Sequence, residues 1–379
     1  MREGFDELRT SLAKLGRAFT PTDVAAALRA QGRVVTDCLV RETLDELRRN
    51  SIGAGPLDEL LNLPDVSDVV VNGASEVFVD RGAGLERAEL CFVDDEQVRR
   101  LAIRLAAAAG RRLDDASPFV DGRLPSGVRL HAVLAPVSEP GTCLSLRVPA
   151  RRNFSLEDLV GSGSLSPEGA GLLGSIVRRR EPFLISGGTG TGKTTLLAAM
   201  LALVPARERM VLVEDARELV PSHPHCVRLE ARPPNAEGAG AISLTTLVRQ
   251  ALRMRPDRVV LGEVRGAEIA DLLTALNTGH EGGCATVHAN SVSDVMARIE
   301  ALAALGGMGR EACHAQVASA LRMVIHVVRE PGGRRSVAQI GVFRRSASGE
   351  VVIEPAANLR PAGVEYTAAG ERLRRMVGP

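Results

Sequence analysis

The chain has 379 residues, of which 45% are hydrophobic and 25% are charged, and its 47 basic and 46 acidic side chains leave a formal net charge of +1. This length accommodates two domains, and the even charge balance argues against constitutive binding to nucleic acid or to a lipid surface. Aromatic residues make up only 2% of the chain, which argues against the base-stacking platforms of single-strand binders.

Residues 1–55 are predicted to form a short helical arm, because apolar residues recur there at helical spacing in two stretches. The first stretch contains Leu8, Leu12 and Leu15, and the second contains Val40, Leu44 and Leu47. Acidic and basic residues interrupt the apolar ones, so the segment lacks the continuous apolar core of a signal peptide.

The cysteines and the apolar stretches indicate in which compartment of the cell the chain is expected. The six cysteines are widely spaced and form no C-x-x-C pair, which argues against a zinc ribbon or a disulfide framework and suits a reducing cytosol. No stretch approaches the length of a membrane span. We therefore expect a cytoplasmic protein that reaches a membrane only through a partner.

Residues 56–150 are predicted to form a compact α+β domain. "VSDVVVNGASEVFVD" indicates two strands around Asn72-Gly73, with Val77 and Val79 in the alternating pattern of a half-buried strand. "DEQVRRLAIRLAAAAGRR" predicts a helix, and "GRLPSGVRLHAVLAPV" and "CLSLRV" predict further strands. The next segment, residues 151–165, is rich in Pro, Gly and Ser and is predicted to be a linker.

Residues 166–379 are predicted to form an α/β domain with a mostly parallel sheet. Short apolar runs, namely "PFLIS", "RMVLVED", "RVVLGE", "GCATVH" and "MVIHVV", alternate with helical patterns such as "SLTTLVRQALRM" and "GAEIADLLTALNTG". Continuous apolar strands of this kind are typical of a parallel sheet that helices cover on both faces. The tail, with "RRSVAQIGVF" and "EVVIEP", predicts a terminal strand pair.

"ISGGTGTGKTT" has the pattern G-x-x-x-x-G-K-[ST] of a phosphate-binding loop, between a predicted strand and a predicted helix. It holds Lys193, one of only two lysines among the 47 basic residues. An ammonium is a compact point charge that fits inside such a loop, where it reaches the β and γ phosphates of ATP, while Thr194 ligates Mg²⁺. The alternative is a chance match. The predicted nucleotide-binding residues are Gly187, Gly188, Thr189, Gly190, Thr191, Gly192, Lys193, Thr194 and Thr195.

Acidic residues at the ends of two predicted strands are candidates for catalysis. Glu263 ends "RVVLGE", and we expect a strand neighbouring the loop to place it where it polarises the attacking water; the alternative is a solvated carboxylate. Residue 262 is Gly, so the common Asp-Glu pair is lacking. Glu214 and Asp215 in "VEDAREL" are candidates for contact with magnesium through water, or else they cap the next turn.

Two histidines flank one predicted strand in "TGHEGGCATVHANS". A histidine at the end of a strand adjacent to the loop can contact the γ-phosphate or its water, so His280 and His288 are candidates for this contact, and the alternative for each is a structural role. The other histidines have no such context and are expected to pack or to face solvent. Zinc is not expected.

The four segments "GGTGTGKTT", "VEDAREL", "LRMRPDRVVLGEVRG" and "TGHEGGCATVHANS" resemble, in this order, the Walker A, Asp, Walker B and His boxes of the type II/type IV secretion ATPase superfamily. The resemblance is greatest to the Tad (Flp) pilus-assembly and conjugation-associated ATPases and extends over residues 56–328. The paired C-x-x-C insertion of the type II secretion branch is absent, and "LRVPA" stands where members often have a doubled arginine and an aromatic residue.

This resemblance implies a RecA-like P-loop domain after a smaller PAS-like α+β domain, and a homohexameric ring with the nucleotide between the two domains. It further implies that arginines of the N-terminal domain reach the phosphates. The matching positions are Arg129 and Arg147, with Arg123 as a third candidate, although each is also one of many arginines in the chain.

The leading hypothesis is a cytoplasmic ATPase motor, peripheral to the inner face of the cell membrane. In this hypothesis ATP binding closes the two domains, hydrolysis opens them, and the ring drives an inner-membrane platform protein of a pilus, secretion or conjugal-transfer machine. One alternative is a RecA-like nucleic-acid translocase, which the charge balance and the scarcity of aromatics disfavour. Another is a non-catalytic scaffold whose bound ATP controls assembly only.

Overall fold

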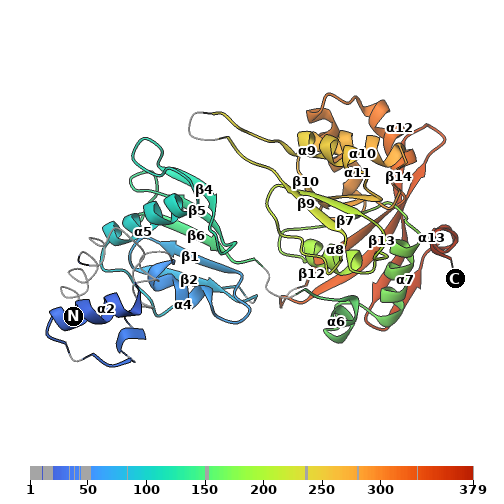
Figure 1. Cartoon of the computed structure of the whole chain (residues 1–379). Helices are drawn as coiled ribbons and strands as arrows, with labels where there is room; N and C mark the ends of the chain where they lie inside the picture. The colour runs from blue at the N-terminus through green and yellow to red at the C-terminus, as the bar shows by residue number, and fades with distance from the viewer. Residues whose placement is uncertain are drawn as a thin grey trace. The chain divides into compact units, whose positions relative to one another are not determined.

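The structure is a computed structural model, and it divides into two compact units, Met1–Pro149 and Ala150–Pro379, each of which is described by itself (Figure 1). It describes residues 11, 20–33, 35–37, 39–41, 43, 53–82, 84–149, 153–234, 238–279, 281–330 and 332–378. None of the helices in these ranges has the length and apolarity that crossing a bilayer requires.

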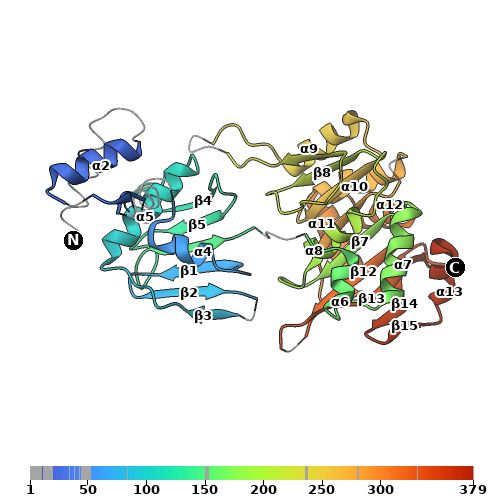
Figure 2. The ribbon, with the colours of Figure 1, turned by 60° about the horizontal axis from the view of Figure 1, so that its bottom comes forward.

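The first unit is built on a six-stranded antiparallel sheet in the order β3-β2-β1-β6-β5-β4 (Figure 2). Its strands are β1 (Asp68–Asn72), β2 (Glu76–Asp80), β3 (Leu85–Arg87), β4 (Phe119–Arg123), β5 (Arg129–Val133) and β6 (Cys143–Arg147). Its helices are α2 (Pro21–Ala30), the 3-10 helix η1 (Gly55–Leu57), α4 (Asp58–Leu61) and α5 (Asp95–Ala108).

The predicted hairpin and the predicted helix of this unit are confirmed. Strands β1 and β2 pair around the turn, where Gly73 has a φ of +64°, and Val77 and Val79 are buried. Helix α5 begins after Asp94, whose side chain accepts a hydrogen bond from the backbone N–H of Gln97 (2.8 Å). Its apolar residues join one face of the sheet in a single core, and the residues at the alternate strand positions are only partly buried or exposed.

The prediction for the N-terminal arm falls largely outside the described residues, because Leu8, Leu12, Leu15, Leu44 and Leu47 are not among them. Within the described part, α2 buries Val24 and Leu28, and Val40 packs against them. A capping box starts the helix, since Thr20 and Asp23 each accept a hydrogen bond from the other's backbone N–H.

The segment predicted as a linker contains a helix, α6 (Leu156–Gly161), and this corrects the prediction. A capping box between Ser155 and Asp158 starts the helix. Leu156 and Leu165 are buried in the core of the second unit. The Gly and Ser content of the segment therefore reflects helix caps and turns, not an extended connection.

The second unit contains a nine-stranded sheet in the order β15-β14-β13-β12-β7-β11-β10-β8-β9. The run from β12 to β9 pairs in parallel, and β13, β14 and β15 extend the sheet in antiparallel fashion. The strands are β7 (Phe183–Gly187), β8 (Met210–Glu214), β9 (Cys226–Glu230), β10 (Arg258–Val264), β11 (Cys284–His288), β12 (Met323–Arg329), β13 (Arg335–Arg345), β14 (Val351–Arg360) and β15 (Gly363–Tyr366). The predicted terminal strand pair is thus confirmed as β13 and β14.

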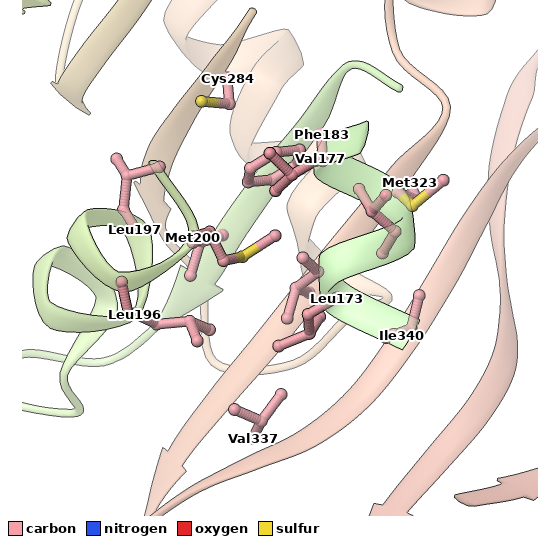
Figure 3. Close-up of a cluster of buried hydrophobic side chains, with 14 of the residues drawn as sticks. Leu173, Val177, Phe183, Leu196, Leu197, Met200, Cys284, Met323, Val337 and Ile340 are labelled. Carbon is pink, nitrogen blue, oxygen red and sulfur yellow. The ribbon is translucent and has the colours of Figure 1, made fainter. Parts of the chain in front are cut away.

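Helices cover both faces of this sheet. One face packs against α6, α7 (Pro167–Arg178), α8 (Lys193–Leu201) and α13 (Gly370–Val377), and Figure 3 shows part of that core. The other face packs against α9 (Leu244–Ala251), α10 (Glu268–Asn277), α11 (Asp294–Leu305) and α12 (Arg310–Ala320), and the 3-10 helix η2 (Leu252–Met254) follows α9. Because every residue of β7 and β8 is buried, polar side chains can emerge only at the ends of the strands.

Candidate nucleotide site

The glycine-rich loop connects β7 to α8, as the sequence predicts. Strand β7 ends at Gly187, residues 188–192 form the loop, and α8 begins at Lys193 with Thr194 and Thr195 in its first turn. A Cβ at Gly187 would lie 2.4 Å from the carbonyl oxygen of Val327, and Gly192 has a φ of +94°, so neither position tolerates a larger residue. The loop is therefore bare backbone in front of a helix N-terminus, an arrangement that binds phosphate.

The side chain of Lys193 folds back into this loop. Its ammonium donates hydrogen bonds to the carbonyl oxygens of Gly187 (3.1 Å) and Gly188 (2.8 Å), and the residue is only 7% exposed. Burial lowers the pKa of Lys193, and the carboxylate of Glu263 opposes this shift. The loop thus encloses the Lys193 ammonium, and its contact with phosphates stays a prediction.

The strand order corrects the expected position of Glu263. We expected a strand next to the loop to carry Glu263, but β11 lies between β7 and β10. The strand beside the loop carries His288, which is in register with Gly187. His288 therefore stands between Lys193 and Glu263.

A continuous network of charged groups runs along this edge of the sheet. His288 Nδ1 lies 3.4 Å from Lys193 Nζ, and His288 Nε2 lies 2.5 Å from Glu263 Oε1. The other carboxylate oxygen, Oε2, accepts a hydrogen bond from Nε of Arg265 (2.6 Å). Arg265 NH1 also lies 3.8 Å from Asp215 Oδ2. The network connects the phosphate-binding loop to Glu263 on β10 and to Asp215, which directly follows β8.

Sequence reasoning missed Arg265. The signal was its position two residues after Glu263, because side chains at i and i+2 of an extended chain point to the same side.

The pKa of His288 is lowered, chiefly because burial disfavours the charged ring. The charge of Lys193 lowers this pKa further, and the carboxylate of Glu263 opposes the shift. A neutral ring can donate from Nε2 to Glu263 and accept at Nδ1 from Lys193, which is the arrangement of the network.

Glu214 lies at the end of β8, beside Gly262 of β10. A Cβ at residue 262 would come within 2.7 Å of Glu214 Cγ, so the glycine makes room for this side chain. Oε1 of Glu214 accepts hydrogen bonds from the backbone N–H groups of Glu218 (3.0 Å) and Leu219 (2.8 Å), as the capping alternative predicts. Burial raises the pKa of Glu214.

The second oxygen of Glu214 bears on whether magnesium fits here. Glu214 Oε2 is buried and has no hydrogen-bond partner among the described residues. A buried acceptor without a partner costs free energy, and a water bound to a cation would supply the missing donor. Together with the hydroxyl of Thr194 on α8, this donor set fits Mg²⁺, whose sites in P-loop proteins consist mostly of water and phosphate oxygens.

The three candidate arginines of the first unit lie side by side on its sheet. Arg123 pairs with Arg129 across β4 and β5, and Arg129 pairs with Arg147 across β5 and β6. Arg147 Nε also lies 3.0 Å from Asp68 Oδ1. Like charges directly opposite each other destabilise a sheet, and Asp68, which stands opposite Arg147 on β1, offsets part of the charge of this row. The remaining candidate, His280, lies outside the described residues.

The fold and this edge define an α/β protein with a glycine-rich loop of P-loop pattern at the carboxyl ends of the parallel strands of its sheet, where such folds bind ligands. The chain belongs to the family described as type II/IV secretion system protein, whose model matches residues 50–371. The sequence-based assignment to the type II/type IV secretion ATPase superfamily is thereby confirmed.

Two relatives and one solved structure illustrate the range of similarity. A protein of Mycobacterium tuberculosis, whose name places it in conjugal transfer, is 54% identical over 316 residues, which are 82% of this chain and 90% of that protein. The type IV secretion system protein PtlH of Bordetella pertussis is 34% identical over 262 residues, which are 63% of this chain and 77% of PtlH. The ATPase DotB of Legionella pneumophila shares the fold, with a TM-score of 0.52 at 20% identity over 76% of this chain and 78% of DotB.

Proposed function

We propose that the chain hydrolyses ATP and is the motor subunit of a membrane-associated transport machine. The observation that carries this proposal is the path from Lys193 through His288 to Glu263, which joins a phosphate-binding loop to a carboxylate within hydrogen-bonding distances. Two comparisons support the proposal. The chain belongs to the type II/IV secretion system protein family, and DotB, which shares its fold, is named as an ATPase.

Each residue of the site has a proposed role. The backbone N–H groups of residues 187–192 and the Lys193 ammonium bind the β and γ phosphates. Glu263 orients and polarises the water that attacks the γ-phosphorus, and His288, with His280, senses the γ-phosphate. Thr194 and, through water, Glu214 hold Mg²⁺, which neutralises charge on the phosphates when it is bound.

The two units would act on each other through the nucleotide. We infer that the row of Arg123, Arg129 and Arg147 contacts the phosphates when the PAS-like and RecA-like units close, and that hydrolysis releases this contact. Six copies would form a homohexameric ring, so that one subunit's closure is coupled to its neighbours. Salt dependence of nucleotide-induced closure would test the contribution of the arginine row.

The machine that we favour is a Tad-type pilus-assembly or conjugal-transfer system. The name of the Mycobacterium relative points to conjugal transfer, and the name of the Bordetella relative points to type IV secretion. In such a machine the ring would be cytoplasmic, would lie against the inner face of the cell membrane and would drive an inner-membrane platform protein.

Phosphate release from ATP by the purified full chain tests this function. We expect magnesium-dependent release by the wild type and none by Lys193→Ala, which removes the charge inside the loop. The assay includes the platform protein, because a ring that assembles with ATP but releases no phosphate even then would identify a scaffold instead. Salt-sensitive stimulation of hydrolysis by single-stranded DNA would identify a translocase.

A further inference from the structure

The hairpin formed by β12 and β13 brings an arginine onto the phosphate-binding loop. Nε of Arg335 donates a hydrogen bond to the carbonyl oxygen of Gly190 at 3.0 Å, although the two residues are 145 positions apart in the sequence. The stem of the arginine also lies against the loop, because a Cβ at Gly192 would be 3.4 Å from Arg335 Cδ. Among the described residues, this carbonyl is the only hydrogen-bond acceptor of the Arg335 side chain.

The preceding arginine of the same hairpin behaves differently. Arg334 is paired with Glu330, with NH2 at 2.8 Å from Oε2 and Nε at 3.0 Å from Oε2. The side chains of Arg334 and Glu330 are 51% and 39% exposed, and Arg334 makes no hydrogen bond to the loop within the described parts of the chain. Two adjacent arginines thus have separate partners, one a surface carboxylate and the other the loop backbone.

A second positive charge lies opposite Arg335. Arg329 is its partner in the antiparallel register of β12 and β13, and Arg329 NH1 would be 3.7 Å from a Cβ at Gly190. Like charges placed directly opposite each other are unfavourable in an antiparallel pair. A phosphate group bound at the loop would offset this repulsion, because its negative charge attracts both arginines.

The hydrogen bond to Gly190 fixes the orientation of one peptide group of the loop. In a trans peptide the C=O of one residue and the N–H of the next point in opposite directions. Holding the Gly190 carbonyl toward Arg335 therefore turns the N–H of Thr191 to the opposite side. That N–H has no hydrogen-bond partner among the described residues, and a positively charged group on the carbonyl makes the N–H a stronger donor.

We propose that Arg335 is a positioning residue for nucleotide binding, which holds the Gly190–Thr191 peptide so that the Thr191 N–H donates to a phosphate of a nucleoside di- or triphosphate. The inference rests on the proposed function, because it assumes that the loop binds a nucleotide. Since Arg335 acts on the loop before hydrolysis, it contributes to binding and not to the chemical step.

The matched variants Arg335→Ala and Arg334→Ala test this role in the full chain. Titration calorimetry with ADP and with ATP gives Kd, and phosphate release gives KM and kcat. We expect Arg335→Ala to weaken binding of both nucleotides by about 10- to 100-fold, the effect of losing one hydrogen bond from a charged donor, with kcat within about threefold of wild type. Arg334→Ala should bind like wild type.

The conservative variant Arg335→Lys distinguishes positioning from a general structural role. A lysine keeps the charge, the aliphatic stem and a donor, so it should recover most of the affinity that alanine loses. If Arg335→Ala fails to fold, Arg335→Lys and Arg335→Gln still test the proposal. Both variants keep a hydrogen-bond donor, but only the lysine keeps the positive charge. Only Arg335→Lys should therefore bind the nucleotide tightly.

Three results would overturn the proposal. One is an unchanged Kd for Arg335→Ala, and another is equal loss of affinity in the lysine and alanine variants. The third is a loss of kcat at constant KM, which would place Arg335 in the chemical step. If wild type binds neither nucleotide, the proposed function itself fails, whereas a wild type that binds both leaves only the role of Arg335 in question.

Discussion

The two ends of β10 carry ion-pair networks of opposite character. At its start, Arg258 is 1% exposed, and its Nε lies 2.7 Å from Oε2 of Glu208, while its NH2 donates to the carbonyl oxygen of Val177 at 2.9 Å. At its other end, Glu263 lies between His288 and Arg265, whose side chains are 36% and 53% exposed. The Arg258–Glu208 pair is itself buried, with the part-exposed Arg180 reaching the other oxygen of Glu208 (3.1 Å), whereas the network at Glu263 is open to solvent.

The difference separates a structural pair from a functional one. Removing one partner of a buried pair leaves an uncompensated charge that water cannot reach, so such a pair cannot exchange partners without loss of stability. A half-exposed network exchanges partners at low cost, because solvent and a nucleotide compete for the same groups. We therefore expect substitutions at the start of β10 to change stability, and substitutions at its end to change catalysis.

The largest effect is expected for Glu208→Ala, which leaves the Arg258 guanidinium buried without its carboxylate. We predict that this variant lowers the free energy of unfolding of the second unit by about 3–5 kcal/mol. Urea denaturation followed by tyrosine fluorescence measures it, because Tyr366 of β15 is the only tyrosine of the chain and lies in this unit. The double variant Glu208→Leu/Arg258→Met, which removes both charges, should lose less; an equal or larger loss would show that the charges are not the cause.

At the other end of the strand, Glu263→Gln is expected to affect turnover and to leave the fold intact. The amide cannot polarise water as a carboxylate does, so kcat for ATP hydrolysis should fall about 100-fold or more. Bound ATP should remain on the protein, which retention on a desalting column measures. The urea midpoint should match wild type, and turnover at the wild-type rate would contradict the assignment of Glu263.

His288 gives the open network a pH dependence. Its pKa is lowered mainly by burial, with Lys193, Arg265 and Arg298 adding to the lowering and Glu263 opposing it. Below the ordinary value of about 6.5, the unfolded chain binds a proton that the folded protein does not, so stability falls as pH falls from that value toward the folded pKa. A His288→Gln variant should lack this loss.

An NMR titration of the imidazole ring measures this effect directly. We expect a midpoint below about 6.5 in the wild type. Because Glu263 opposes the lowering, the Glu263→Gln variant should move the midpoint further down. A midpoint above that of a model histidine would mean that the Glu263 carboxylate dominates the site.

The smallest effect is expected for Asp271→Asn on α10. Asp271 is mostly covered, but its partner Arg249 of α9 is largely exposed, and Nε of Arg249 lies 2.8 Å from Asp271 Oδ1. Solvent screens such a pair, so the loss in unfolding free energy should be about 0.2–1 kcal/mol in the tyrosine-detected urea experiment. A loss as large as that of Glu208→Ala would remove the distinction between closed and open pairs.

Several features of the fold were accessible from local sequence. The hairpin at Asn72-Gly73, helix α5 and the glycine loop between β7 and α8 each depend on residues that are close together in the chain. Helix α6 was accessible in principle, because Ser155 and Asp158 have the spacing of a capping box. The Gly and Ser residues around it concealed this signal.

The arrangement of the site was not accessible in the same way. The order β7-β11-β10 puts His288 beside the loop and Glu263 one strand further away. Periodicity indicates that a segment is a buried strand, but it does not indicate which strands are neighbours, because the crossover helices and the packing of both faces decide that order.

By itself, the sequence determined where the phosphate-binding loop lies, which lysine it holds and which family the chain belongs to, since these depend on a contiguous pattern of residue types. The tertiary structure alone decided that His288 connects Lys193 to Glu263 and that Arg335 contacts Gly190. These contacts join residues far apart in the chain, and they form only when strands and helices pack into one core, which no local pattern encodes.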